Sequence, residues 1–191
     1  MKIYFTASVL QKNEYNDYYQ EIIDSLQKKG HKVIHEHVTE SDMDFVNSQT
    51  ERQNREYYQK VQGAISNSDM VVAEVSFPST LNIGHEITLA LSKNKPVICL
   101  YLEGKISAFF NGIKNDKLIY ESYNPKTLKE VVLRSFETLS GVTDTRFNFY
   151  ISPEIGNYLD WVSQHKKLPR AVFLRSLLEK SMKTEKDFKN Q

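Results

Sequence analysis

The chain has 191 residues, of which 40% are hydrophobic and 26% charged, as expected for one good core with a small appendage. A formal net charge of +1 gives no general attraction to nucleic acid or to a membrane surface. The single cysteine, Cys99, excludes an internal disulfide, and no apolar run approaches the roughly 20 residues that span a bilayer. We therefore expect a cytoplasmic protein without a membrane partner.

Residues 1–140 alternate strand patterns with helical patterns. The predicted strands are residues 2–7, 32–37, 70–75, 97–101 and 117–120. The predicted helices are residues 13–29, 55–66, 83–93 and 126–139, and a long mobile loop is expected over the polar residues 41–54. Strands that alternate with helices favour a parallel sheet covered on both faces. The predicted fold is therefore α/β, with a flavodoxin- or Rossmann-like five-stranded parallel sheet.

The segment 69–100 is the most informative part of this domain. A short apolar strand runs into a polar turn, and the turn opens a helix whose first residues include Gly84 and Glu86. Small molecules bind at the carboxyl ends of such strands, and the free N–H groups of a helix start attract anions. Glu86 is thus placed to meet a sugar and its phosphate, although it could also be a favourable acid in the first turn of a helix.

The pattern changes after residue 140. Residues 145–151, TRFNFYI, alternate polar and apolar side chains and predict a strand. Ser152 and Pro153 then mark the start of a helix to about residue 166, and Pro169 opens a second one. From Asp144 onward nine Lys/Arg oppose six Asp/Glu, an excess of three positive charges that hints at a separate partner.

Residues 1–125 resemble the nucleoside 2-deoxyribosyltransferase family, and most of all its branch of 2′-deoxynucleoside 5′-monophosphate N-glycosidases. Several short motifs carry the resemblance in the same order along the chain. They are YFTAS (4–8), EHV (36–38), DMVVAEVSFPS (69–79), GHE (84–86), KPVICLY (95–101) and ISAFFNG (106–112). The resemblance implies cleavage of the bond between base and deoxyribose, by attack of a glutamate on the anomeric carbon and release by water or a second base.

The resemblance also implies roles for individual residues. Glu86 would be the nucleophile, and the hydroxyl of Tyr4 would orient its carboxylate. The remaining substrate contacts, above all to a 5′-phosphate, would come from Ser8, Ser79, Gly84 and, from a neighbouring subunit, Ser107. Hydroxyls and helix N-termini suit a phosphate because they offer hydrogen-bond donors without bulk.

Two positions depart from the family pattern. Leu10 stands where an arginine is usual, so a charge-assisted phosphate contact is missing. Val61 stands where the family carries an aspartate that acts on base or sugar. Glu56, or a carboxylate of the loop 41–54, could replace it. No His, Cys or Asp cluster has the spacing of metal ligands, so we expect neither metal nor cofactor.

Residues 145–183 resemble a ribbon–helix–helix domain, followed by a polar tail over 184–191. In such domains two chains pair their strands into a ribbon that fits the DNA major groove. The resemblance implies a homodimer or higher homo-oligomer. The residues that it places on DNA are Arg146, Asn148, Tyr150 and Arg170. The alternative is a unit that only dimerises.

Two hypotheses follow for the whole chain. The first is an enzyme that cleaves the base from a nucleoside or its 5′-monophosphate, as an N-glycosidase or a deoxyribosyltransferase, with Glu86 as nucleophile. The second is a nucleotide-sensing, DNA-binding regulator that keeps the pocket and has lost turnover. Glu86 and Tyr4 favour the first hypothesis, whereas Leu10 and Val61 favour the second.

Overall fold

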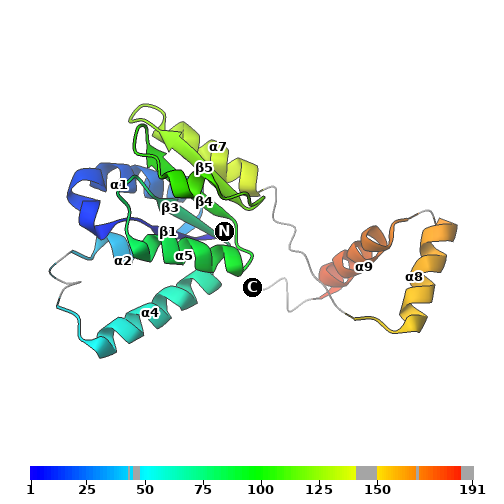
Figure 1. Ribbon diagram of the computed structural model, residues 1–191. Helices are drawn as coiled ribbons and strands as arrows, with labels where there is room; N and C mark the ends of the chain where they lie inside the picture. The colour runs from blue at the N-terminus through cyan, green and yellow to red at the C-terminus, as the bar shows by residue number, and fades with distance from the viewer. Residues whose placement is uncertain (43, 45–47, 141–149, 167, 186–191) are drawn as a thin grey trace. The chain divides into compact units, whose positions relative to one another are not determined.

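The computed structural model describes residues 1–185 with the exception of 43, 45–47, 141–149 and 167 (Figure 1). The chain divides into two compact units, Met1–Thr145 and Arg146–Gln191. The first unit has a large apolar core on both faces of a sheet, and the second has a small one of its own.

The first unit is built on a five-stranded parallel sheet, as the sequence predicts (Figure 1). Its strands lie in the order β2-β1-β3-β4-β5. They are β1 (Lys2–Thr6), β2 (Lys32–Ile34), β3 (Met70–Glu74), β4 (Val97–Leu102) and β5 (Leu118–Tyr123). The strand order reverses between β1 and β3, which makes the carboxyl ends of these two strands the expected ligand site of an open α/β sheet.

Helices cover both faces of this sheet (Figure 1). The elements between the strands are η1 (Val9–Gln11), α1 (Lys12–Lys28), α2 (Glu36–Thr39), α4 (Glu51–Ser66), α5 (Leu81–Ser92) and α6 (Ala108–Asn111), and α7 (Leu128–Ser140) follows β5. α1 and α7 share one apolar cluster with the sheet, and α4 and α5 share another. Successive side chains of β1 alternate between them, because Ile3 and Phe5 join the first cluster and Tyr4 joins the second.

β2 is shorter than the predicted strand 32–37. It ends at Ile34, and α2 begins at Glu36. The carboxylate of Glu36 accepts a hydrogen bond from the backbone N–H of His35 at 3.0 Å, which stabilises the start of this short helix. His37 therefore lies on a helix at the carboxyl end of β2 and not in the strand.

α4 begins earlier than the predicted helix 55–66, so the prediction of a loop over 41–54 is wrong from Glu51 onward. A capping box sets this start. The Thr50 hydroxyl accepts a hydrogen bond from Gln53 N–H at 3.3 Å, and the Gln53 side chain accepts one from Thr50 N–H at 2.9 Å. Residues 51–60 are all exposed, so the first part of α4 lacks the apolar stripe that predicts a helix.

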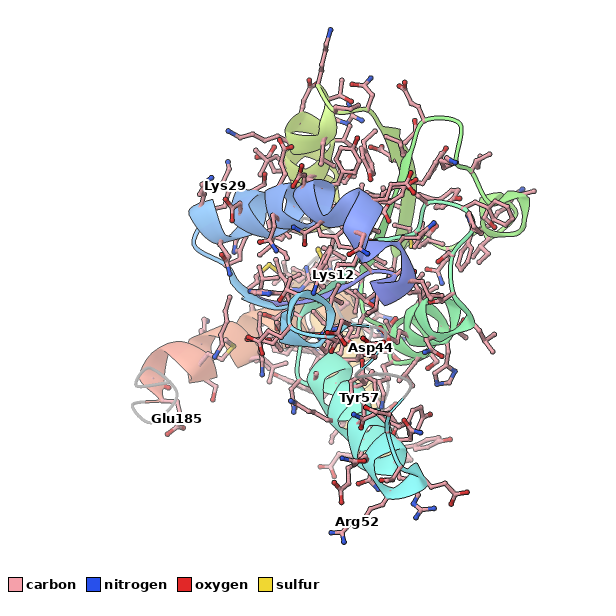
Figure 2. The ribbon with its side chains drawn as sticks, turned by 90° about the vertical axis from the view of Figure 1, so that its left-hand side faces the viewer. Lys12, Lys29, Asp44, Arg52, Tyr57 and Glu185 are labelled. Carbon is pink, nitrogen blue, oxygen red and sulfur yellow. The ribbon has the colours of Figure 1, made fainter. Side chains whose placement is uncertain are left out.

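The segment that follows α2 is tied to α1 by one lysine, labelled in Figure 2. The ammonium group of Lys12 donates hydrogen bonds to the backbone carbonyls of Thr39 and Ser41. A charged donor that bonds two carbonyls holds a connecting segment in place. Ser41 is consequently buried beside the carboxyl end of β1.

The second unit contains two helices, α8 (Pro153–Lys166) and α9 (Arg170–Thr184), close to the predicted ones. Its core is small and is formed by Leu159, Val162 and Phe173. Residues 145–149 of the predicted strand, with Arg146 and Asn148, lie outside the described residues. The likeness of this unit to a ribbon–helix–helix domain stays a prediction. Within the part of the chain that is described, no helix is long and apolar enough to cross a membrane.

Candidate active site

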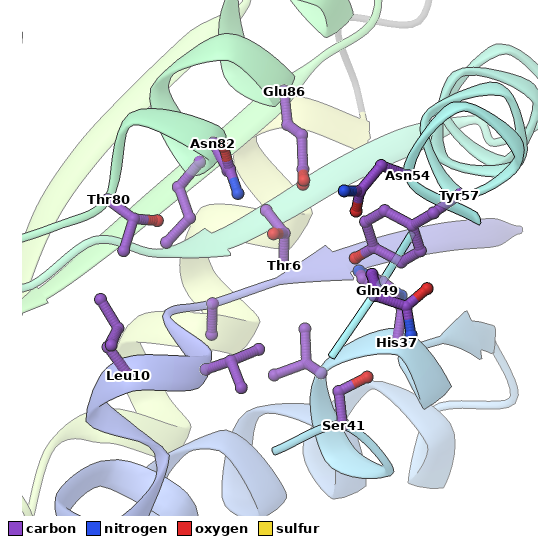
Figure 3. A pocket seen from close by; sticks show the side chains of 14 residues that line it. Thr6, Leu10, His37, Ser41, Gln49, Asn54, Tyr57, Thr80, Asn82 and Glu86 are labelled. Carbon is purple, nitrogen blue, oxygen red and sulfur yellow. The ribbon is translucent and has the colours of Figure 1, made fainter. Parts of the chain in front are cut away.

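A cavity of about 220 Å³ lies at the carboxyl end of β1, beside the start of α5 (Figure 3). Thr6 and Ala7 of β1 and its following turn form one wall. Helix α5 provides Glu86, and Tyr57 of α4 closes another side. The cavity occupies the point where the strand order reverses, which is where an open parallel sheet accommodates small ligands.

Glu86 is the central polar group of this cavity. Its side chain is only 7% exposed, and its Oε2 accepts a hydrogen bond from the Tyr4 hydroxyl at 3.2 Å. Burial raises the pKa of the Glu86 carboxyl above its ordinary value, and hydrogen bonds from Thr6 and Tyr4 offset part of that rise. The structure therefore brings together the two residues to which the sequence assigns the chemistry.

The position of Glu86 in its helix differs from the prediction. α5 begins at Leu81 and not at residue 83, and it has no acidic residue in its first turn. The alternative role of Glu86, as a favourable acid in the first turn of a helix, is therefore excluded. A buried carboxylate in the second turn, at a cavity, has no such stabilising function.

His37 forms the wall beneath this pair. Its ring stacks on Tyr4 with centroids 4.6 Å apart and planes 9° from parallel. Burial lowers the pKa of the His37 imidazole to about 4, so the ring is neutral near pH 7. Its Nε2 is buried and has no hydrogen-bond partner among the described residues. A neutral, stacked imidazole can orient Tyr4 but cannot serve as an acid at neutral pH.

The serines expected at the phosphate lie near the cavity without lining it. Ser8 is buried at the end of β1, and its backbone carbonyl accepts a hydrogen bond from the Tyr19 hydroxyl at 3.1 Å. Ser79 is half-buried just before α5. The side chains that line the cavity at this end are those of Thr80 and Asn82, at the start of α5 (Figure 3).

Gly84 and Ser107 are also absent from the cavity wall of one chain. A Cβ on Gly84 would lie 3.9 Å from Phe110, an ordinary contact, so steric crowding does not require a glycine there. Ser107 follows β4, and its backbone N–H donates a hydrogen bond to the Tyr120 hydroxyl at 2.9 Å. Its contact with the pocket of a second subunit stays a prediction.

The two departures from the family pattern have clear structural settings. Leu10 lines the cavity and is mostly exposed, and the described residues that line the cavity include no Lys or Arg. Val61 belongs to the apolar cluster beneath α4 and α5. Glu56 pairs with Arg52 at 2.8 Å on the exposed side of α4 and does not replace the expected acid. Among the described residues that line the cavity, Glu86 is the only carboxylate.

Three further lining residues, Gln49, Asn54 and Tyr57, were not predicted as site residues. Gln49 and Asn54 fall in the predicted loop 41–54, whereas Tyr57 falls in the predicted helix 55–66, where no motif marks it. Their signal was the capping box TERQ at residues 50–53, which starts α4 early enough to bring Asn54 and Tyr57 onto its cavity side. In Figure 3 the amide of Asn54 and the hydroxyl of Tyr57 point into the same space as the Glu86 carboxylate.

A second cavity, of about 400 Å³, adjoins the first between α4 and α5. The two cavities share Asn54, Tyr57, Asn82 and Glu86. The second one also contains Tyr58, whose hydroxyl lies 3.1 Å from the Nε2 of His85 and accepts a hydrogen bond from Gln62 at 2.9 Å. Glu86 thus lies at the junction of two spaces that together suit a ligand with two distinct parts.

Two other acidic residues of the segment 69–100 have structural roles. Asp69 accepts a hydrogen bond from the backbone N–H of Lys2 at 2.7 Å and fixes the start of β1. Glu74 lies on the opposite face of the sheet from Glu86, where Ser76 and Tyr123 donate hydrogen bonds to its Oε1. Glu74 therefore pairs with neighbouring side chains and does not line the cavity. Nor does any group of three His, Cys, Asp or Glu within the described ranges form a candidate metal site.

Comparison with known proteins finds no matching family model but several curated relatives. The chain is 34% identical over 144 residues to 2′-deoxynucleoside 5′-phosphate N-hydrolase 1 of Nematostella vectensis, which covers 72% of this chain and 95% of that protein. It is 31% identical to the 5-hydroxymethyl-dUMP N-hydrolase of Danio rerio, over 73% of this chain and 99% of that protein.

The solved structures add a likeness in fold. CMP N-glycosidase of Clostridium botulinum superposes with a TM-score of 0.50 at 17% identity, over 70% of this chain and 97% of that one. At this identity the match supports the α/β architecture alone.

Proposed function

Since the chain belongs to the 2′-deoxynucleoside 5′-phosphate N-hydrolase family, we propose that it hydrolyses the bond between base and sugar in a 2′-deoxynucleoside 5′-monophosphate. The observation that carries this proposal is a buried glutamate, Glu86, held by a tyrosine at a cavity where the strand order reverses.

In the proposed reaction the Glu86 carboxylate attacks C1′ of the sugar. The C1′–N bond breaks, its electron pair moves onto the base, and a glycosyl ester forms on Glu86. Water then attacks C1′, loses a proton and releases both the sugar phosphate and the carboxylate. Tyr4 holds one carboxylate oxygen at 3.2 Å, which fixes the orientation of the nucleophile.

The 5′-phosphate is proposed to lie at the start of α5. The backbone N–H groups of the first turn there are free of intrahelical partners, and the side chains of Thr80 and Asn82 offer further donors. Ser79 lies two residues before this helix, Ser8 follows β1, and Ser107 would approach from a second subunit. Without an arginine at position 10, neutral donors would have to hold the phosphate.

Chromatography of free base tests the proposal. The purified chain is incubated with deoxynucleosides, deoxynucleoside monophosphates and ribonucleotides, with Glu86→Gln beside it. Base release from a deoxynucleoside monophosphate that is lost in the variant supports the proposal. If no substrate releases base while a nucleotide still raises the melting temperature, the site is a sensor and the hydrolase proposal is wrong.

A second proposal concerns the helices α8 and α9. We propose that they associate with a second copy of the chain, because large apolar side chains stay exposed on a two-helix unit with a small core. Leu178 is 66% exposed, and Trp161 and Val172 are close to half exposed. Light scattering after gel filtration should give a dimer or larger oligomer, and Leu178→Glu should weaken it. A monomeric wild type would contradict this proposal.

DNA binding by this unit stays a prediction. Tyr150 is fully exposed, whereas Arg170 forms an ion pair with Asp160 of α8. Gel-shift assays with random duplex DNA at two salt concentrations test it, because contacts to phosphates make affinity fall as salt rises. Absent or salt-insensitive binding would leave association of two chains as the function of the unit.

A further inference from the structure

Among the described residues that line the cavity, no carboxylic acid other than Glu86 is available for the leaving base. Cleavage of the C1′–N bond, the proposed function on which this inference rests, moves an electron pair onto the base, and a donor that meets this charge lowers the barrier. Glu86 is the single carboxylate among the described lining residues, and it is already assigned to the attack on C1′. Burial lowers the pKa of His37 to about 4, so its imidazole is neutral near pH 7 and carries no acidic proton for the base.

Tyr57 occupies the place of the missing acid. It lies on α4 four residues before Val61, where the family pattern expects an aspartate, so both residues share one side of the helix. Tyr57 lines both cavities, and its hydroxyl has no hydrogen-bond partner among the residues that the structure describes. Figure 3 shows this hydroxyl and the Glu86 carboxylate directed into the same space.

We propose that the Tyr57 hydroxyl donates a hydrogen bond to the leaving base while Glu86 attacks C1′. As the C1′–N bond breaks, its electron pair moves onto the base, and Tyr57 stabilises the negative charge that develops there. The base departs as an anion and takes its proton from water, which the hydrolysis already supplies. Tyr57 keeps its own proton throughout.

The electrostatics of the cavity agree with a donor that is never ionised. Burial and then the nearby Glu86 carboxylate raise the pKa of Tyr57 to about 12. The phenol is thus protonated near neutral pH. An aspartate at position 61, by contrast, would have to hold a proton near neutral pH to donate at all.

The test compares Tyr57→Phe with the wild type on two pairs of substrates. The first pair is dTMP and 5-fluoro-dUMP, whose base is the better anion. The second pair is dGMP and its 7-methyl derivative, whose base leaves without negative charge. In each pair that the wild type cleaves, Tyr57→Phe should lower kcat/KM by about 10²-fold for the unmodified nucleotide, dTMP or dGMP. For the modified nucleotide, whose base leaves more easily, the loss should be less than about tenfold.

Tyr18→Phe is the matched control. Tyr18 lies on α1, packs against the apolar cluster on the opposite face of the sheet and lines neither cavity. The Tyr18→Phe variant should cleave all four nucleotides at the wild-type rate.

An equal loss on both members of a pair, or no loss, in Tyr57→Phe would overturn the role of Tyr57 and leave the hydrolase proposal intact. A wild type that releases base from none of the deoxynucleoside monophosphates, these four included, would overturn both. The two failures are therefore distinguishable.

Discussion

The two faces of the sheet each bury one glutamate, and they treat it differently. Glu74 is 1% exposed beneath α1 and α7, Ser76 and Tyr123 donate hydrogen bonds to its Oε1, and it lines neither of the two cavities described above. Glu86 is 7% exposed beneath α4, accepts a hydrogen bond from the Tyr4 hydroxyl on one oxygen, and lines the cavity. Burial raises the pKa of both carboxyls. A perturbed pKa therefore does not identify the functional residue, and access to a ligand does.

The largest expected effect separates the two glutamates by activity. Glu86→Gln removes the nucleophile, and base release should fall by about 10⁴-fold or more. Glu74→Gln should leave base release unchanged, because its side chain does not reach the cavity. Chromatography of free base measures both. Equal losses in the two variants would mean that the faces are not functionally distinct.

The second prediction uses the pH dependence of stability. Burial raises the pKa of Glu74 to about 7 from an ordinary 4.5, so the folded chain binds more protons than the unfolded chain between these values. Its contribution to stability is complete below pH 4.5 and is lost as pH rises to about 7, by about 3 kcal/mol.

Glu74→Gln keeps an acceptor for Ser76 and Tyr123 and cannot ionise. The variant should therefore be more stable than the wild type at pH 8, with a smaller difference or a reversal at pH 4.5. Urea denaturation at the two pH values measures it. An identical pH dependence in wild type and variant would show that Glu74 is ionised in the folded chain. The face of the sheet beneath α1 and α7, here called the closed face, would then tolerate its charge.

The third prediction tests the role of Tyr4 on the face of the sheet that carries Glu86 and the cavity, here called the open face. Tyr4→Phe removes the hydrogen bond of 3.2 Å to Glu86, and kcat/KM should fall by about tenfold. Because this bond lowers the pKa of Glu86, its loss should raise that pKa further. The carboxylate is the reactive form, so activity rises with pH, and the rising limb should shift to higher pH in the variant. A smaller rate with an unmoved limb would assign Tyr4 to packing alone.

The closed face was easier to predict from the sequence than the open one. Apolar periodicity placed α1 within one residue at each end, since Tyr15, Tyr19 and Ile22 are buried beneath it. Glu86 and Tyr4 were found through motifs of the family. The first four residues of α4 were not predicted because they are exposed and polar, and its start depends on the hydrogen bonds of Thr50. Tyr57 lies in the part of α4 that was predicted, but a site residue on the exposed part of a helix leaves no apolar pattern that would mark it.

The smallest predicted effect tests whether the open face depends on that cap. Thr50→Ala removes one half of the capping box and should cost about 1 kcal/mol of stability. Asn124→Ala is the matched change on the closed face, because the Asn124 side chain accepts hydrogen bonds from the N–H groups of Lys126 and Thr127 before α7.

Thermal melting should show similar losses for the two variants. Only Thr50→Ala should also raise KM for the nucleotide, because loosening the start of α4 displaces Asn54 and Tyr57 from the cavity. If Asn124→Ala raised KM as much, the position of Tyr57 would depend on the stability of the whole unit, and α4 would not be the element that adjusts the site independently of the core.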